Sequence, residues 1–241
     1  MAGDPGAVSS ASASRFPAGW RSWLAAFLVG GLIGAGAMWL ASGAIVRSAL
    51  LRNPEMIAEG LQRLQERELA KVVVANRPAF ETPFAGAWAG AKDGDVTLVE
   101  FFDYACSFCR KSNADLDRLA KEDGKLRIVW REWPVLGPDS EAAAKASLAA
   151  AAAGRFKPFH DALFAAGRPT PAAVAAASRA VGLASPAPPR NGAEELSRNY
   201  DLARAIGANG TPTFVVGDRV LRGAVGYQAL KAAISQARER G

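Results

Sequence analysis

Residues 96–109 read VTLVEFFDYACSFC, and this stretch decides the fold. Its first seven residues are apolar apart from one threonine and one glutamate, a composition typical of a buried strand. Cys106 and Cys109 come directly afterwards, and Leu116 and Leu119 then recur at helical spacing. The sequence therefore predicts a strand that ends in a cysteine pair, with a helix beginning at that pair.

The segments that follow extend this strand into a sheet with helices. Residues 126–130, LRIVW, predict a second strand, and the order strand–helix–strand gives a parallel pair. Helical patterns are found at 140–153, 156–166, 171–181 and 193–206. A hairpin is expected from short strands at 213–216 and 220–221, and a last helix at 227–240. This order predicts an α/β domain over 95–240, with a helical block inserted at about 139–206.

The spacing of the two cysteines predicts dithiol–disulfide chemistry. Cys106 falls in the last turn before the helix, where free backbone N–H groups and the helix dipole stabilise a thiolate. Cys109 lies about one helical turn further on, close enough to form a disulfide with Cys106, and more buried. Disulfide exchange needs such an exposed attacking thiolate and a shielded second thiol. We expect the Cys106–Cys109 disulfide to serve as the redox group, with no separate cofactor.

Composition excludes several other classes of protein. The chain has 241 residues, with two cysteines, one histidine and a net charge of +6. A closed zinc site needs four ligands and a disulfide-stapled scaffold needs more cysteines, so no metal site is predicted. Copper(I) can be held by two thiolates alone, and a copper-binding protein stays an alternative. The basic residues form no clustered stripe, which argues against a nucleic-acid partner.

Glu100 is the one charged residue in the predicted strand before the cysteines. By strand alternation it shares a face with Leu98 and Phe102, and so it is expected to point inward beneath the site. A buried carboxylate is costly unless it is paired or has a chemical role. We interpret Glu100 as the proton acceptor for Cys109. The alternative is a glutamate on an edge strand that faces solvent.

The segment Gly210-Thr211-Pro212-Thr213 lies just ahead of the third predicted strand. Proline cannot donate a ladder hydrogen bond, so it belongs at a strand start or in a turn. A cis bond before Pro212 would present the preceding backbone for pairing with an extended peptide. An ordinary trans proline at the end of a loop is the alternative.

The first part of the chain is organised differently from the rest. Residues 1–19 are mostly small and polar, and a disordered tail is predicted over 1–22. Residues 23–46 carry no charge, and as a helix they would reach about 36 Å, enough to cross a hydrocarbon core of about 30 Å. The sequence therefore predicts a transmembrane anchor there. A cleaved signal peptide is the alternative, because residues 41–44 are small enough for a cleavage site.

Residues 47–75 predict a short amphipathic stalk helix, and residues 76–94 predict a linker. Ile57, Leu61 and Leu64 recur on one face of the stalk at helical spacing. This apolar face either rests on the folded domain or lets copies of the chain associate.

Three motifs together resemble the DsbA-like thioredoxin-fold family. They are EFFDYACSFC followed by Arg110-Lys111, the segment 137–140 (GPDS) and the segment 210–218 (GTPTFVVGD). The resemblance covers about residues 95–238. It implies a thioredoxin fold with a helical insertion, a redox-active Cys106–Cys109 pair, and a cis Thr211–Pro212 bond that faces this pair. It also implies that Glu100 is the buried acid of the family.

The stretch IVRSALLRNPEMIAEGLQRLQERE, which begins at Ile45, looks like the N-terminal segment of the ScsC (suppressor of copper sensitivity) branch. Members of that branch oligomerise through this segment and act as disulfide isomerases or reductases. Ser107 and Phe108 stand where the oxidase prototype has Pro and His, so one charge that stabilises the thiolate is missing and we expect a less oxidising disulfide. Thr211 before the proline also resembles the isomerases.

These expectations combine into one interpretation. The chain is predicted to be a thiol–disulfide oxidoreductase of isomerase or reductase type, anchored in the inner membrane with its catalytic domain in the periplasm. Its partners would be protein substrates, bound at Ser107, Phe108, Thr211 and Pro212, and a membrane protein that recharges the thiols. The alternatives are a dithiol oxidase, the copper-binding protein named above, and a chaperone that binds unfolded chains without exchange.

Two further sites have structural interpretations. His160 falls in a predicted helix, where we expect a surface or packing position without a catalytic role. Trp133 and Pro134 follow the second predicted strand and either shape the wall of a binding groove or pack in the core.

Overall fold

The computed structural model describes residues 20–183 and 189–240. The chain divides into two compact units, Met1–Leu61 and Gln62–Gly241. The predicted tail therefore lies almost wholly outside the described residues, and the predicted cysteine site belongs to the second unit.

The first unit is built from helix. Helix α1 runs over Trp20–Arg52, and helix α2 begins at Glu55 and continues to Ala75. The break falls at Asn53-Pro54, because proline has no N–H to continue the ladder of α1. The boundary at residue 46 expected from the sequence therefore lies inside a helix. Among the described residues no helix is both long and apolar enough to span a membrane, so the anchor at 23–46 stays a prediction.

The second unit is built on a five-stranded sheet, with strand order β1-β3-β2-β4-β5. The strands are β1 (Trp88–Gly90), β2 (Val96–Phe102), β3 (Leu126–Glu132), β4 (Thr213–Val216) and β5 (Arg219–Arg222). Strand β2 pairs parallel with β3 and antiparallel with β4, so it is central and covered on both edges. The predicted parallel pair and the predicted hairpin β4–β5 are confirmed.

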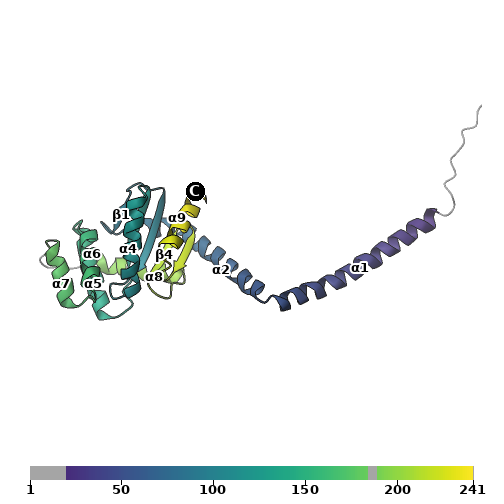
Figure 1. The fold of residues 1–241 in the computed structure, drawn as a ribbon, viewed down its shortest axis with the longest axis horizontal. Coiled ribbons are helices and arrows are strands. Elements are labelled where there is room, and N and C mark those ends of the chain that lie inside the picture. Colours follow the sequence, from purple (N-terminus) through teal and green to yellow (C-terminus); the bar gives the residue numbers. More distant parts are fainter. Residues whose placement is uncertain (1–19, 184–188, 241) are drawn as a thin grey trace, which may run out of the picture. The chain divides into compact units, whose positions relative to one another are not determined.

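Helices cover both faces of this sheet (Figure 1). The helices after α2 are α3 (Arg77–Glu81), α4 (Ser107–Glu122), α5 (Pro138–Ala152), α6 (Phe156–Ala166), α7 (Pro171–Ala180), α8 (Gly192–Ala205) and α9 (Tyr227–Arg240). Helices α5, α6 and α7 pack on one another beside the sheet, between β3 and β4 in the chain. An α/β domain with an inserted helical block is therefore confirmed.

Alternating residues of β2 supply two separate cores. Leu98 and Phe102 pack with residues of α4 and α9 on one face. Val99 and Phe101 pack with residues of α3, α8 and the end of α2 on the other face. Because both faces of β2 are buried, the cysteine pair at its carboxyl end rests on a fixed support.

Two short elements differ from the predicted linker at 76–94. Helix α3 begins just after Asn76, with Pro78 near its start, and β1 adds an antiparallel strand at the edge beside β3. Segments of five and three residues are too short to show a periodic pattern, and tertiary contacts rather than local sequence define them.

Candidate active site

The two cysteines lie at the junction of β2 and α4. Cys106 is the N-cap of α4, with extended backbone angles of φ −80° and ψ 115°, and its N–H donates to the Asp103 carbonyl (3.0 Å). Cys109 lies in the first turn and is 1% exposed, against 6% for Cys106, so Cys109 is the more buried thiol as expected, whereas Cys106 is itself buried and not exposed as the sequence predicted. Both are free thiols. The structure thus places the Cys106 thiol at the N-terminal end of α4 and the Cys109 thiol within the first turn of the helix.

The loop before β4 meets the first cysteine. Sγ of Cys106 lies 3.2 Å from the carbonyl oxygen of Thr211. The Thr211–Pro212 peptide bond is cis, and the Pro212 carbonyl accepts from the N–H of Gly223 (2.8 Å). Thr211 is half-buried and its backbone lies directly beside the reactive sulfur.

The surroundings of the two thiols drive their pKa values apart. The pKa of Cys106 is lowered to about 5, first by its hydrogen bond with Cys109 and then by the Thr211 side chain and the N–H groups of Cys109 and Phe108. The pKa of Cys109 is raised, first by burial, then by the same hydrogen bond and by the charge of Glu100. Cys106 is therefore the thiolate near neutral pH, and Cys109 keeps its proton.

Glu100 lies in the central strand and is 1% exposed, so the alternative of an edge glutamate facing solvent is wrong. Its strand neighbours are Trp130 and Phe214. Burial raises its pKa well above the usual value, and the charge of Cys106 adds to this. Among the described residues its Oε1 has no hydrogen-bond partner. A buried oxygen without a partner needs an explanation, and a chemical role is one that the predicted proton acceptor would supply.

Asp103 is a site residue that the sequence analysis missed. Its Oδ1 accepts from the N–H of Ala105 (2.7 Å), and its Oδ2 accepts from the N–H groups of Val135 (2.8 Å) and Leu136 (2.9 Å). It therefore ties the cysteine loop to the loop after β3. An aspartate two residues before a turn favours this kind of hydrogen bond, and that signal was present in the sequence.

Apolar side chains form an exposed rim around the site. Phe108, between the cysteines, is 61% exposed, and Ser107 is also exposed. Val135 and Leu136, held by Asp103, are 40% and 54% exposed. Trp133 is not part of this rim: it is buried and packs edge-on against Phe101 (6.5 Å between ring centroids), so its core interpretation holds.

His160 is a packing residue and not a surface residue. It is fully buried among aromatic rings, with Trp130, Phe156 and Phe164 at centroid distances of 4.8–5.2 Å. Its Nδ1 lies 3.1 Å from the Tyr104 hydroxyl, two residues before Cys106. It therefore supports the cysteine loop from below.

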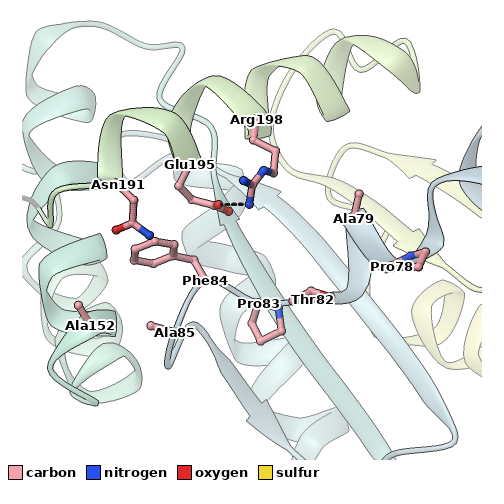
Figure 2. Close-up of a pocket in the computed structure, with 10 residues that line it drawn as sticks. All are labelled: Pro78, Ala79, Thr82, Pro83, Phe84, Ala85, Ala152, Asn191, Glu195 and Arg198. Atoms are coloured by element: carbon pink, nitrogen blue, oxygen red, sulfur yellow. Dashed lines mark hydrogen bonds and ion pairs between the residues drawn. The ribbon is translucent and has the colours of Figure 1, made fainter.

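A cavity of about 680 Å³ lies elsewhere in this unit, between the segment after α3 and helix α8 (Figure 2). Arg198 and Glu195 form an ion pair in its wall (3.0 Å), and Glu195 also binds the buried Arg131 (3.0 Å). Neither cysteine lines this cavity. No group of three or more metal-binding side chains is found within 20–183 and 189–240, so copper binding would rest on the two thiolates alone.

The comparison with family models gives one match. The DSBA-like thioredoxin domain matches residues 97–235. This range includes both cysteines, Glu100, and the Thr211–Pro212 segment, so every residue of the site described above lies inside the matched domain.

Solved structures agree with this match. A thioredoxin-like oxidoreductase from Silicibacter pomeroyi DSS-3 is 38% identical, with a TM-score of 0.64, over 68% of this chain and 98% of that chain. A linker-deletion mutant of Proteus mirabilis ScsC is 25% identical, with a TM-score of 0.71, over 82% and 93%. A periplasmic thioredoxin-like protein from Salmonella enterica serovar Typhimurium is 25% identical, with a TM-score of 0.63, over 68% and 95%. The predicted resemblance, including its ScsC branch, is confirmed.

Curated relatives share only part of their length with this chain. The Na(+)/H(+) antiporter NhaA 1 of Salinispora arenicola is 31% identical over 156 residues, which is 61% of this chain and 24% of that protein. The chain thus spans about a quarter of the length of such relatives.

Proposed function

Because this chain belongs to the DSBA-like thioredoxin domain family, we propose that it exchanges disulfides with polypeptide substrates, in the isomerase or reductase direction. The observation that carries this proposal is the opposite shift of the pKa values of the two thiols. Cys106, with a pKa lowered to about 5, lies at the N-terminal end of α4, and Cys109, with a raised pKa, lies one turn further into the helix and is more buried. This is the arrangement that exchange through a mixed disulfide requires.

The first step uses Cys106. Its thiolate attacks one sulfur of a substrate disulfide, the substrate S–S bond breaks, and the other sulfur leaves as a thiolate. The carbonyl of Thr211 accepts from Cys106 only while Cys106 carries a proton. Once Cys106 is a thiolate, this carbonyl is free to accept an N–H from the substrate backbone. Phe108 and the exposed rim contact apolar side chains of an unfolded substrate.

The second step uses Cys109 and Glu100. When Cys106 is in a mixed disulfide its negative charge is gone, so one cause of the raised pKa of Cys109 and of Glu100 is removed. The Glu100 carboxylate accepts the proton of Cys109, and the new thiolate attacks the Cys106 sulfur. The Cys106–Cys109 disulfide forms and the substrate leaves as a dithiol. In isomerisation a freed substrate thiolate attacks instead and releases reduced Cys106, with no net redox change.

One feature supports the isomerase or reductase direction. No histidine stands beside Cys106 to stabilise its thiolate by a positive charge, because the only histidine of the chain is the buried His160, and a less stabilised thiolate makes the disulfide less oxidising. A dithiol oxidase is the second candidate, and a specific observation favours it: a pKa of about 5 stabilises the reduced form of Cys106, which makes a disulfide more oxidising.

The experiment that decides is a pair of assays on the full chain. Reactivation of scrambled ribonuclease measures isomerisation, and oxidation of reduced ribonuclease measures oxidase activity. We expect strong reactivation by the reduced protein and weak oxidation. Strong oxidation without reactivation would make the protein an oxidase, and a chain inactive in both assays would overturn disulfide exchange altogether.

We further propose that the catalytic domain works in the periplasm and that the N-terminal segment keeps it at the inner membrane, where a membrane protein recharges the thiols. The support is the similarity to a periplasmic thioredoxin-like protein and the uncharged stretch at 23–46. A carbonate wash of membranes tests the anchor: the intact protein should stay with the membrane fraction, and release would argue for a cleaved signal.

A further inference from the structure

A series of hydrogen-bonded side chains runs beneath the site, and disulfide exchange as proposed does not use it. Glu132 Oε1 lies 2.8 Å from Ser147 Oγ, and Ser147 Oγ lies 2.9 Å from the Tyr104 hydroxyl. The Tyr104 hydroxyl lies 3.1 Å from His160 Nδ1, and His160 Nε2 lies 3.2 Å from Asn113 Oδ1. All five side chains are buried. The series joins the end of β3 to α5, the cysteine loop, α6 and α4.

Its hydrogens can be placed by counting from the Asn113 end. The Nδ2 group of Asn113 donates to Asp161 Oδ1 (3.3 Å), so Oδ1 of Asn113 is the atom that faces His160. A carbonyl oxygen only accepts, and therefore Nε2 of His160 must carry a hydrogen.

The other ring nitrogen of His160 then accepts. Burial among aromatic rings, with the Lys157 charge nearby, holds the pKa of His160 well below its usual value, so the ring is neutral and Nδ1 has no hydrogen. The Tyr104 hydroxyl must donate to Nδ1, which leaves its oxygen to accept from Ser147. The single hydroxyl hydrogen of Ser147 is then used, and Ser147 can only accept from Glu132.

This last contact requires a proton on Glu132. An ionised Glu132 would take the hydrogen of Ser147 and leave the oxygens of Ser147 and Tyr104 facing each other at 2.9 Å without a hydrogen between them. The other complete arrangement, a charged His160 with an ionised Glu132, buries two charges in an apolar core.

The charged groups around Glu132 agree with the neutral form. Burial is the main cause that raises the pKa of Glu132, to about 7; the contact with Ser147 and a backbone hydrogen bond lower it, and Glu195 of α8 raises it further. Arg131 on the same strand opposes it, but its guanidinium is held by Glu195 and Asn199. Among the described residues Oε2 of Glu132 has no partner, which costs less for a neutral acid than for a carboxylate.

We propose that Glu132 is a positioning residue for the thiol site. As a neutral acid it donates to Ser147, so that every hydrogen bond from Glu132 to Asn113 has a donor and an acceptor. The series then holds Tyr104, two residues before Cys106, and Asn113, four residues after Cys109. The effect on exchange rests on the proposed function, whereas the placement of hydrogens does not. Loss of the Glu132 proton breaks one contact of the series and loosens the segment that carries Cys106.

The first test reads the hydrogens directly. Because the chain has one histidine, ¹⁵N-labelled histidine in the full-length protein gives the signals of His160 alone. We expect a neutral ring with its hydrogen on Nε2 at pH 6. A hydrogen on Nδ1, or a charged ring, would overturn the proposal without any variant being made.

The second test reads the effect on the thiol. The rate at which the reduced full chain reacts with a small disulfide should rise as Cys106 ionises near pH 5, then fall roughly threefold to tenfold as Glu132 ionises near pH 7, the size of one buried hydrogen bond. In Glu132→Gln the amide donates to Ser147 at every pH, so the fall should vanish while the rise stays.

Glu141→Gln is the matched control, because Glu141 lies on α5 but is exposed and pairs with Lys145. It should keep the wild-type profile. A fall that persists in Glu132→Gln, or no fall in the wild type, would overturn the positioning role. A chain that reacts with the disulfide at no pH would overturn the proposed function. The ¹⁵N spectrum would still test the placement of the hydrogens, because it does not depend on thiol reactivity.

Discussion

The sulfur of Cys106 and the carbonyl oxygen of Thr211 lie 3.2 Å apart, although 105 positions separate the two residues in the chain. The contact exists because β2 and β4 are antiparallel neighbours in the sheet, so the carboxyl end of β2 lies beside the start of β4. It gives the Cys106 sulfur a backbone acceptor, which under the proposed function a substrate strand would also use. The Thr211 side chain, in turn, helps to lower the pKa of Cys106.

Replacing Thr211 by valine should therefore make Cys106 less acidic. The variant Thr211→Val keeps the shape of the side chain but removes its hydroxyl, and we expect the pKa of Cys106 to rise by roughly half a unit to one unit, the value of one hydrogen bond. The pH dependence of the ultraviolet absorbance of the thiolate measures this. Thr97→Val, in the same sheet but at the other end of β2, should leave the pKa in place, and an unchanged value in Thr211→Val would contradict the assignment.

Glu100→Gln should slow the second step of exchange and leave the first step intact. The amide cannot accept the proton of Cys109, and loss of a general base typically costs a factor of at least ~100. In single-turnover experiments, mixed disulfides should then accumulate on Cys106, as they would in Cys109→Ser, where no second thiol exists. If mixed disulfides decay as fast in Glu100→Gln as in the wild type, Glu100 has no role in resolution.

The contribution of the Cys106 thiolate to the stability of the reduced protein should grow as the pH rises above 5. The pKa of Cys106 is about 5 in the folded chain, below the value of 9.0 for an unperturbed thiol, so between these limits the unfolded chain binds more protons. The stability due to the thiolate is therefore present at high pH and is lost as the pH falls through 5. Urea unfolding of the reduced wild type and of Cys106→Ser at several pH values measures this. Their difference should widen with pH, by at most about 1.4 kcal/mol per unit, and a constant difference would contradict the lowered pKa.

Features of the site that depend on neighbouring residues in the sequence could be predicted, and features that depend on contacts between distant residues could not. The apolar run of β2 and the cysteine spacing are local, and they predicted both the strand and the position of the cysteine pair at the start of a helix. Alternation along β2 indicated that Glu100 points inward. Asp103 and Tyr104 act through partners that lie 32 to 56 positions away, and no local signal identifies those partners. The short strand β1 forms only because β3 is there to pair with it.

Asp103→Ala should destabilise the loop that carries Val135 and Leu136. The substitution leaves three backbone N–H groups without the acceptor that they share, and we expect a loss of about 2–3 kcal/mol in the free energy of unfolding. Urea unfolding measures the loss, with the exposed Asp139→Ala as control. Exchange with peptide substrates should weaken more than exchange with a small disulfide, because the exposed rim is disordered while the thiols stay. Equal effects on both substrates would show that the rim does not bind substrate.

The exposed face of α2 predicts association between copies of the chain. Ile57, Leu61 and Leu64 are 50%, 60% and 53% exposed, an apolar stripe that costs free energy in water unless another surface covers it. Leu61→Glu combined with Leu64→Glu should therefore lower the mass of the full chain in detergent solution by an integer factor, as measured by sedimentation equilibrium. Gln62→Glu with Gln65→Glu adds the same charge to neighbouring positions of the helix and should leave the mass unchanged. If the parent chain is already a monomer under these conditions, the stripe does not join copies of the chain.

If the charged pair dissociates the assembly and also abolishes ribonuclease reactivation but not reaction with a small disulfide, isomerisation requires two thiol sites in one particle.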